Sequence, residues 1–147
     1  MTKNNLLQRP QKEVFYNVKA KLLDPLGINL ANAVEWWEIK DDSINQTNEY
    51  PVVVIGEGNP ILMLHGFDSC FLEFRRLVPY LINTHKIIIP DMFGFGFCPR
   101  PINVNYGKDT ILRHLSRILE LLNKGEPIGL IGASMGGAIA MELGRMH

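Results

Sequence analysis

Residues 128–143 read IGLIGASMGGAIAMEL, and this stretch decides the fold class. It opens with a short apolar run over residues 128–131, of the kind that forms a strand buried on both faces of a sheet. Gly132-Ala133-Ser134-Met135-Gly136-Gly137 follows, and then an apolar segment with helical spacing. A strand that turns sharply into a helix is a building unit of α/β sheets, so the stretch predicts an α/β protein.

Ser134 lies at the centre of this G-x-S-x-G turn. A sharp strand-to-helix turn holds the serine in strained backbone geometry, so the residues two positions away must be small. Gly132 and Gly136 meet that need, and Gly137 lets the helix approach the sheet. The turn exposes the Ser134 hydroxyl at a helix N-terminus, where the helix dipole favours developing negative charge. We predict that Ser134 is a nucleophile; the alternative is a glycine-rich turn with an incidental serine.

The rest of the chain supplies the other parts of such a sheet. Two more apolar runs, over residues 61–64 and 87–89, predict buried strands. Helical patterns lie between the runs, over residues 69–81 and 109–124, the second capped by Asp109 or Thr110 and stopped at Gly125. Strand–helix–strand alternation predicts a mostly parallel sheet with flanking helices.

The N-terminal part of the chain shows a different pattern. Residues 34–39 and 52–55 predict two antiparallel strands joined by a long polar connection over residues 41–49. Residues 1–32 give only weak helical signals, interrupted at residues 24–27, and we treat them as an N-terminal extension of uncertain structure. The predicted domain therefore covers residues 33–147.

In sheets of this kind the ligand site lies beyond the carboxyl ends of the strands, so the loops after the apolar runs are where chemistry is expected. His65-Gly66-Phe67 follows the run at residues 61–64. Gly66 lets the chain bend, and the N–H groups of Phe67 and Met135 could form an oxyanion hole for an acyl-transfer intermediate. We interpret His65 as a buried, hydrogen-bonded residue that shapes this loop rather than as a base.

The loop after residue 89 begins Pro90-Asp91-Met92-Phe93-Gly94-Phe95-Gly96-Phe97. Its two glycines resemble the start of a dinucleotide-binding fingerprint, but Pro99 stands where the third glycine belongs, and the chain has no phosphate-loop motif. We expect Asp91 to anchor the loop by local hydrogen bonds. Phe93, Phe95 and Phe97 could form an aromatic wall for an apolar substrate, although for any single phenylalanine core packing is the better explanation.

Taken in this order, His65-Gly66-Phe67, the loop from Asp91 to Gly96, and the turn around Ser134 resemble the α/β-hydrolase superfamily. The resemblance spans about residues 34–145 and is nearest to single-domain esterases, C–C hydrolases and haloperoxidase-like members. It implies a serine hydrolase that cleaves an ester, thioester or related carbonyl substrate through an acyl-enzyme at Ser134. A serine rather than an aspartate at this turn argues against dehalogenase or epoxide-hydrolase chemistry.

One departure from the family pattern is serious. Family members place an acid and then a histidine after the nucleophile, but His147 is the only histidine that follows Ser134. His147 ends the predicted helix, and His85 and His114 precede the serine, so none suits a general base. The triad acid and histidine are therefore not in this chain. We expect an N-terminal portion of a hydrolase, cut after the helix that follows Ser134; the alternatives are a non-catalytic binding or receptor protein and an inactive fragment.

Composition limits the remaining classes. The 147 residues carry 15 basic and 15 acidic side chains, which disfavours a nucleic-acid binder, and the longest uncharged stretch, residues 127–141, is too short to span a membrane. Two cysteines and no signal-like N-terminus fit a reducing, cytoplasmic location. We expect no cofactor and no metal, and a small apolar carbonyl compound as substrate; the sequence does not indicate an oligomeric state.

Overall fold

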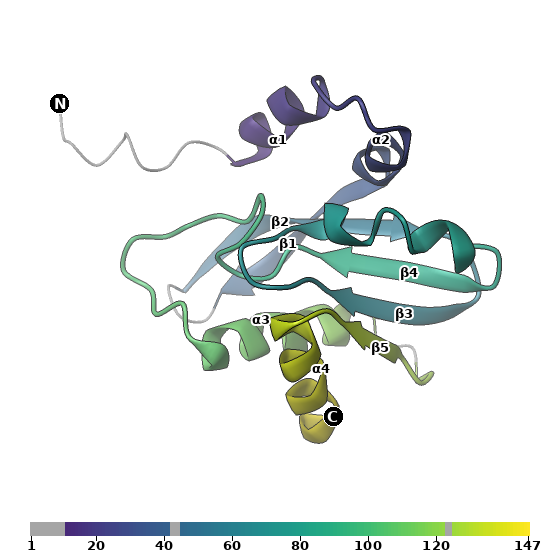
Figure 1. Ribbon diagram of the computed structural model, residues 1–147. Helices are drawn as coiled ribbons and strands as arrows, with labels where there is room; N and C mark the ends of the chain where they lie inside the picture. Colours follow the sequence, from purple (N-terminus) through teal and green to yellow (C-terminus); the bar gives the residue numbers. More distant parts are fainter. Residues whose placement is uncertain (1–10, 42–44, 123–124) are drawn as a thin grey trace, which may run out of the picture.

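The computed structural model describes residues 11–41, 45–122 and 125–147. Five strands form one sheet in the order β1-β2-β4-β3-β5 (Figure 1). The strands are β1 (Val34–Asp41), β2 (Gln46–Ile55), β3 (Asn59–Leu64), β4 (His85–Pro90) and β5 (Gly129–Gly132). β2 is antiparallel to both β1 and β4, whereas β3 is parallel to both of its neighbours, β4 and β5. This mixed sheet confirms the predicted hairpin that leads into a parallel sheet.

Helices cover both faces of the sheet. The α-helices are α1 (Gln11–Lys19), α2 (Pro25–Asn32), α3 (Lys108–Leu122) and α4 (Met135–Met146), and two 3₁₀ helices are η2 (Phe71–Phe74) and η3 (Val78–Tyr80). Figure 1 shows α1 and α2 on one face and α3 and α4 on the other. Because β3, β4 and β5 run parallel, their carboxyl ends lie at the same end of the sheet. The three candidate loops begin there.

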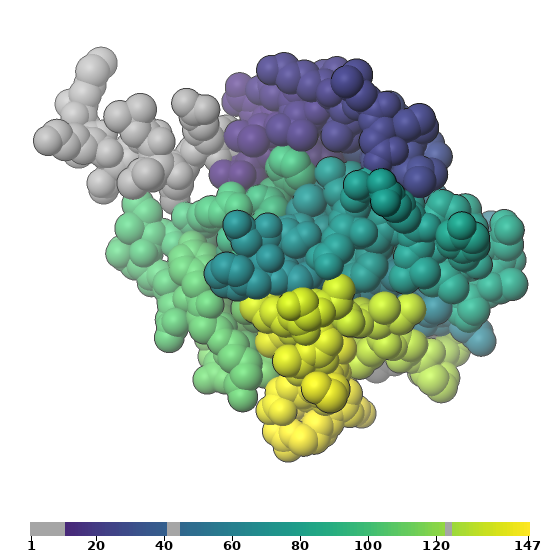
Figure 2. Space-filling model, in the orientation of Figure 1, coloured from purple at the N-terminus to yellow at the C-terminus, as the bar shows by residue number. Residues whose placement is uncertain are grey.

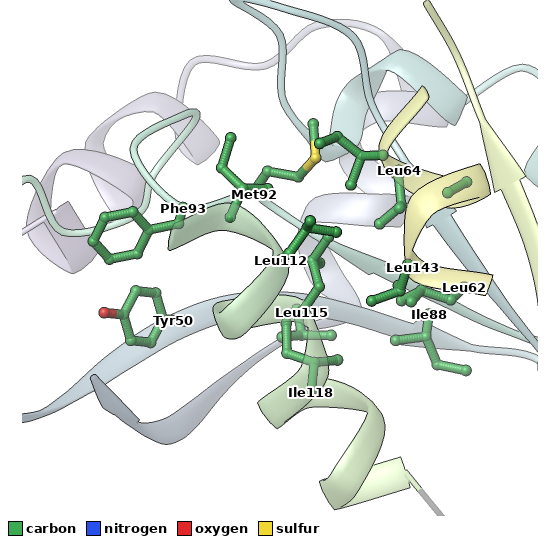
Figure 3. Close-up of a cluster of buried hydrophobic side chains, with 14 of the residues drawn as sticks. Tyr50, Leu62, Leu64, Ile88, Met92, Phe93, Leu112, Leu115, Ile118 and Leu143 are labelled. Atoms are coloured by element: carbon green, nitrogen blue, oxygen red, sulfur yellow. The ribbon is translucent and has the colours of Figure 1, made fainter. Parts of the chain in front are cut away.

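Each central strand contributes side chains to both hydrophobic clusters, because successive side chains of a strand point to opposite faces of the sheet. Leu62 and Leu64 join the cluster under α3 and α4, while Met63 between them joins the cluster under α1 and α2. Ile88 joins the first cluster in the same way (Figure 3). This double burial is the reason that short, unbroken apolar runs mark β3 and β4 in the sequence.

Residues 11–32, which the sequence predicts as part of an N-terminal extension, contribute to this core. Phe15 of α1 is 2% exposed and packs edge-on against Trp36 and Phe97, and Leu30 of α2 is equally buried. The turn at Asp24 does not simply end a helix: its carboxylate accepts a hydrogen bond from the Leu26 amide and caps α2. Weak periodicity hid these two helices because each is short and buries only one narrow face.

Three predicted boundaries were wrong. β2 begins at Gln46, so residues 46–49 are paired with β1 and the connection of the hairpin is short; residues 42–44 of it lie outside the described part of the chain. Residues 69–81 form η2, η3 and turns rather than one α-helix, since Pro79 lacks the N–H that a continuous helix needs. α3 begins at Lys108, so Asp109 and Thr110 lie inside its first turn rather than capping it; residues 123–124, which the predicted helix included, are not described.

β5 lies at the edge of the sheet, not at its centre. Among the described residues β5 pairs with β3 alone, and Leu130 and Ile131 are only half-buried. The expectation of a strand covered on both faces therefore fails for β5. Figure 2 shows α4, in yellow, projecting from the body of the molecule, and Met141 on that helix is 75% exposed.

Candidate active site

Ser134 occupies the turn between β5 and α4 in a strained conformation. Its φ of 51° and ψ of −119° lie in a region that side-chain-bearing residues rarely adopt. The residue is exposed, and although it stands at the N-cap of α4 its hydroxyl makes no capping hydrogen bond. Its carbonyl instead accepts the Gly137 amide at 2.9 Å. Strain that the surrounding structure holds in place is typical of functional positions.

The glycines of the turn are required for space. A Cβ on Gly132 would collide with the backbone of Gly136, and a Cβ on Gly136 would collide with the carbonyl of Leu64 at the end of β3. Neither glycine has a positive φ. The turn is therefore so tight that backbone packs directly on backbone on both sides of Ser134.

The loop after β3 lies against this turn. The Ala133 amide donates to the Leu64 carbonyl at 3.0 Å, and the position of a Cβ on Gly66 would be 3.4 Å from Cβ of Ser134. Within the described residues, neither the Phe67 amide nor the Met135 amide donates to another backbone carbonyl. Two uncommitted N–H groups on either side of an exposed serine suit the binding of an oxyanion.

His65 is completely buried and connects two loops. Its Nδ1 lies 2.8 Å from the Gly66 carbonyl oxygen, and its Nε2 accepts the Met92 amide at 2.9 Å. An accepting Nε2 places the ring proton on Nδ1. Burial lowers the pKa of His65, more than the carbonyl of Gly66 and the charge of Glu73 raise it. Both ring nitrogens are therefore occupied by loop contacts, and none is left to act as a base on Ser134.

Asp91 organises the loop after β4. Its carboxylate accepts the Phe71 amide and the Phe97 amide, each at 2.7 Å, and its carbonyl accepts the Cys98 thiol at 3.1 Å. A Cβ on Gly96, whose φ is +53°, would collide with this carboxylate. Burial raises the pKa of Asp91 to about 7, although the two amides act in the opposite direction. The contacts with Phe97 and Cys98 are local, as expected, whereas the contact with Phe71 reaches η2, so Asp91 fixes both the shape of the loop and its position against η2.

The three phenylalanines of this loop do not form one wall. Phe93 is buried against Tyr50 and Tyr106, and Phe97 packs against Phe15 on the other face of the sheet. Only Phe95 faces the candidate site, where its ring lies 5.5 Å from that of Phe67. The turns within the loop send these side chains in different directions, which equal spacing in the sequence did not reveal.

The four histidines contact residues other than Ser134. The ring nitrogens of His65 bind the loops after β3 and β4. His85 is at the start of β4, at the end of the sheet opposite to the carboxyl ends where Ser134 lies. His114 packs against the ring of Tyr50, and Nε2 of His147 lies 2.9 Å from the Ser116 hydroxyl at the far end of α4.

Glu73 is a residue of the site that sequence reasoning missed. Its carboxylate accepts the Gly66 amide at 2.7 Å from a position on η2. A charged residue in a segment of mixed polarity looks like an ordinary surface position, and no spacing rule connects it with a glycine seven residues earlier.

Hollows in the described surface include one beside α4 and one beside the loop after β3. One of about 390 Å³ lies between α3, β5 and the end of α4, and includes Leu130 and His147, well away from Ser134. A more open one of about 450 Å³ adjoins the loop after β3 and includes Cys70 and Arg100. In the described ranges, no three His, Cys, Asp or Glu side chains are grouped to hold a metal ion. No helix there is long and apolar enough to cross a membrane.

A protein family and several known proteins match this chain in sequence. A family profile described as the alpha/beta hydrolase fold matches residues 59–147, which include every candidate site residue. The chain is 36% identical over 90 residues to the 2-hydroxy-6-oxo-2,4-heptadienoate hydrolase of Pseudomonas putida. That alignment covers 59% of this chain and 32% of the relative, so the chain matches about a third of the relative's length.

Solved structures give the same relationship. The meta-cleavage product hydrolase of Pseudomonas fluorescens IP01 is 32% identical with a TM-score of 0.62, covering 67% of this chain and 37% of that one. The putative lipase of Acinetobacter baumannii shares the fold with a TM-score of 0.71 at 21% identity, covering 90% and 42%. The chain has a tight strand–serine–helix turn at the carboxyl ends of its parallel strands, and the family profile matches more than half of its length. This chain therefore belongs to the α/β-hydrolase family.

Proposed function

We propose that this chain carries the nucleophile and the oxyanion hole of a serine hydrolase that cleaves an ester, thioester or related carbonyl substrate. The observation that carries the proposal is the conformation of Ser134, an exposed, non-glycine residue held at positive φ at the start of α4. Strain of this kind costs about 1–3 kcal/mol and persists only where the surroundings impose it.

The reaction begins with attack of the Ser134 hydroxyl oxygen on the substrate carbonyl carbon. The hydroxyl proton passes to a general base, and the carbonyl oxygen becomes an oxyanion that the Phe67 and Met135 amides can stabilise. Collapse of this intermediate releases the leaving group, which takes the proton from the base. Water then attacks the acyl group on Ser134 by the same steps, which frees the serine and yields the acid.

The general base and its acid are the parts that this chain does not supply. We propose that they come from polypeptide beyond these 147 residues, in keeping with the third of a relative's length that the chain matches. Removing base assistance typically costs about 10²–10⁴-fold in rate. The 147 residues alone are therefore proposed to be inactive or very slow, and the longer polypeptide active.

The substrate proposed here is apolar near its carbonyl group. The Phe67 side chain is 73% exposed and its ring contacts that of the partly buried Phe95, so Phe67 offers an exposed aromatic surface beside the loop after β3. The Pseudomonas putida relative is named for a hydrolase of 2-hydroxy-6-oxo-2,4-heptadienoate, a carbonyl compound, which supports this class. Cleavage of a carbon–carbon bond beside a ketone and transfer of an acyl group to an acceptor other than water use the same nucleophile, and the turn does not separate them.

The protein to test is the gene product at its full translated length. Its hydrolysis of p-nitrophenyl esters of increasing acyl length is measured. Wild-type protein is expected to release nitrophenol, and Ser134→Ala to retain less than about 1% of the rate. Ser69→Ala, on the loop after β3, is the matched serine control and is expected to keep most of the rate. Hydrolysis that survives Ser134→Ala at the wild-type rate would remove Ser134 from the mechanism. A folded wild-type protein with no activity would favour the alternative of a non-catalytic binding protein on this scaffold.

A further inference from the structure

We propose that Glu73 is a positioning residue of this site: its carboxylate fixes the Gly66 peptide, and through it the direction of the Phe67 N–H group. The proposal rests on the proposed function, because it assigns Glu73 a part in that reaction. Glu73 Oε2 accepts the Gly66 amide at 2.7 Å, and its own amide donates to the Cys70 carbonyl at 3.0 Å, which anchors it in η2. Gly66 is buried and lies against Ser134.

Peptide planarity turns this contact into a directional constraint. The carbonyl of Gly66 and the N–H of Phe67 belong to one planar trans peptide and point in opposite directions. Nδ1 of His65 holds that carbonyl at 2.8 Å, and Glu73 holds the N–H of the peptide before it. Both peptides that flank Gly66 are thus fixed, so both of its torsion angles are fixed.

Without Glu73 only one of the two peptides would be held. Glycine populates more of backbone torsion space than any other residue, so a glycine in this position needs constraint from outside. Loss of the contact would also leave a buried N–H group without a partner. The expected consequence is an oxyanion donor that is present but poorly aimed.

The charge of Glu73 is not what the site needs. A carboxylate close to a developing oxyanion opposes it electrostatically, so any benefit of Glu73 must come through the position of the Gly66 peptide. Contact and charge are separable by substitution. Glu73→Gln keeps an acceptor oxygen at the same reach and loses the charge, whereas Glu73→Asp keeps the charge and is one methylene too short to make the contact.

The test measures phosphonylation of Ser134 by a fluorophosphonate in the gene product at its translated length. The readouts are the maximal labelling rate and the probe concentration at half-maximal rate. Glu73→Asp is expected to slow the maximal rate by about 10- to 100-fold with little change in the half-saturating concentration, because one oxyanion donor is misaligned. Glu73→Gln is expected to stay within about fivefold of wild type, since a neutral acceptor is weaker but correctly placed. Glu57→Gln, on the exposed turn between β2 and β3, is the control and should not change the rate.

A second readout shows whether the contact itself is lost. The Gly66 amide proton, followed by NMR, should lie downfield and be protected from exchange in wild type and Glu73→Gln, and should lose both properties in Glu73→Asp. Slow labelling of Glu73→Gln despite a protected Gly66 amide would overturn the proposal, and so would a wild-type rate in Glu73→Asp. Absence of Ser134 labelling in the wild-type protein would instead refute the proposed function, and the role of Glu73 with it.

Discussion

The ring of His65 accepts the Met92 amide at 2.9 Å, and this hydrogen bond joins the loop after β3 to the loop after β4. Neither partner is near the other in sequence, and both are completely buried. Because the other ring nitrogen lies 2.8 Å from the Gly66 carbonyl oxygen, a single imidazole links the loop after β4 to the glycine that lies against Ser134. The histidine of this loop is thus a structural link whose effect on the site is indirect.

Replacing His65 should therefore cost stability before it affects chemistry. His65→Ala removes both loop contacts and leaves the buried Met92 amide unpaired, for an expected loss of about 2–4 kcal/mol in the free energy of unfolding. Urea denaturation of the wild type and the variant at pH 8 measures this loss. His85→Ala, at the start of β4, is the matched control and should change the free energy by less than about 0.5 kcal/mol. Equal losses in the two variants would contradict the assigned role.

The same imidazole should make the fold sensitive to acid. The pKa of His65 is lowered by burial, so the unfolded chain binds a proton more readily than the folded one. The stabilising contribution of neutral His65 is thus fully present above the ordinary histidine pKa of 6.5 and is lost as the pH falls below it. Unfolding free energies from pH 8 to pH 5 should fall less steeply in His65→Gln than in wild type. Parallel curves would show that His65 titrates normally.

Asp91 should act in the opposite direction. Burial raises its pKa from 3.8 to about 7, so between these values the folded state keeps a proton that the unfolded state has released. Stability should therefore decline as the pH rises through this interval, by up to about 1.4 kcal/mol per pH unit. Asp91→Asn removes the titration, so the variant should lack this decline, and the difference in unfolding free energy between the variant and wild type should change with pH across this interval. Denaturant titrations at half-unit pH steps decide the matter: a difference that does not depend on pH would contradict the raised pKa.

Two glycines of α4 should respond to the same substitution with opposite signs. Gly136→Ala places a methyl group against the Leu64 carbonyl, which cannot move without breaking β3, so the expected cost is about 3 kcal/mol or more. At Gly144 an added Cβ would meet only Leu130 Cδ1, at 3.5 Å, and alanine in a helix interior is favoured over glycine by about 1 kcal/mol. Thermal melting of both variants tests the pair. A Gly136→Ala protein as stable as wild type would show that the turn is looser than described.

Much of this arrangement could be predicted from the sequence. The apolar runs at β3 and β4 are visible because both faces of these strands are buried, and the Ser134 turn is visible because its glycines are sterically required. The directions of the aromatic side chains were not predictable, since Phe93, Phe95 and Phe97 diverge through turns that no local pattern encodes. Glu73 was missed for a related reason: its partner is a backbone amide, which leaves no trace in residue identity.

Phe95 should influence substrate preference rather than the chemical step. Phe95→Ala removes the partly buried ring that contacts the exposed ring of Phe67, while the proposed oxyanion donors stay in place. The expected result is a rise in KM of about tenfold for long-chain esters, from the loss of roughly 1–2 kcal/mol of apolar contact, with kcat nearly unchanged. Phe93→Leu, in the core, should lower stability without this dependence on chain length. A fall in kcat that is the same for short and long esters would remove Phe95 from the substrate surface.

The central claim is that Ser134 is the residue that forms the covalent intermediate. The most direct measurement is peptide mapping by mass spectrometry of the gene product, at its translated length, after treatment with a fluorophosphonate. We predict a single phosphonyl adduct on the peptide that contains Ser134, and none in Ser134→Ala. An adduct on any other residue, or equal labelling of wild type and Ser134→Ala, would contradict the account.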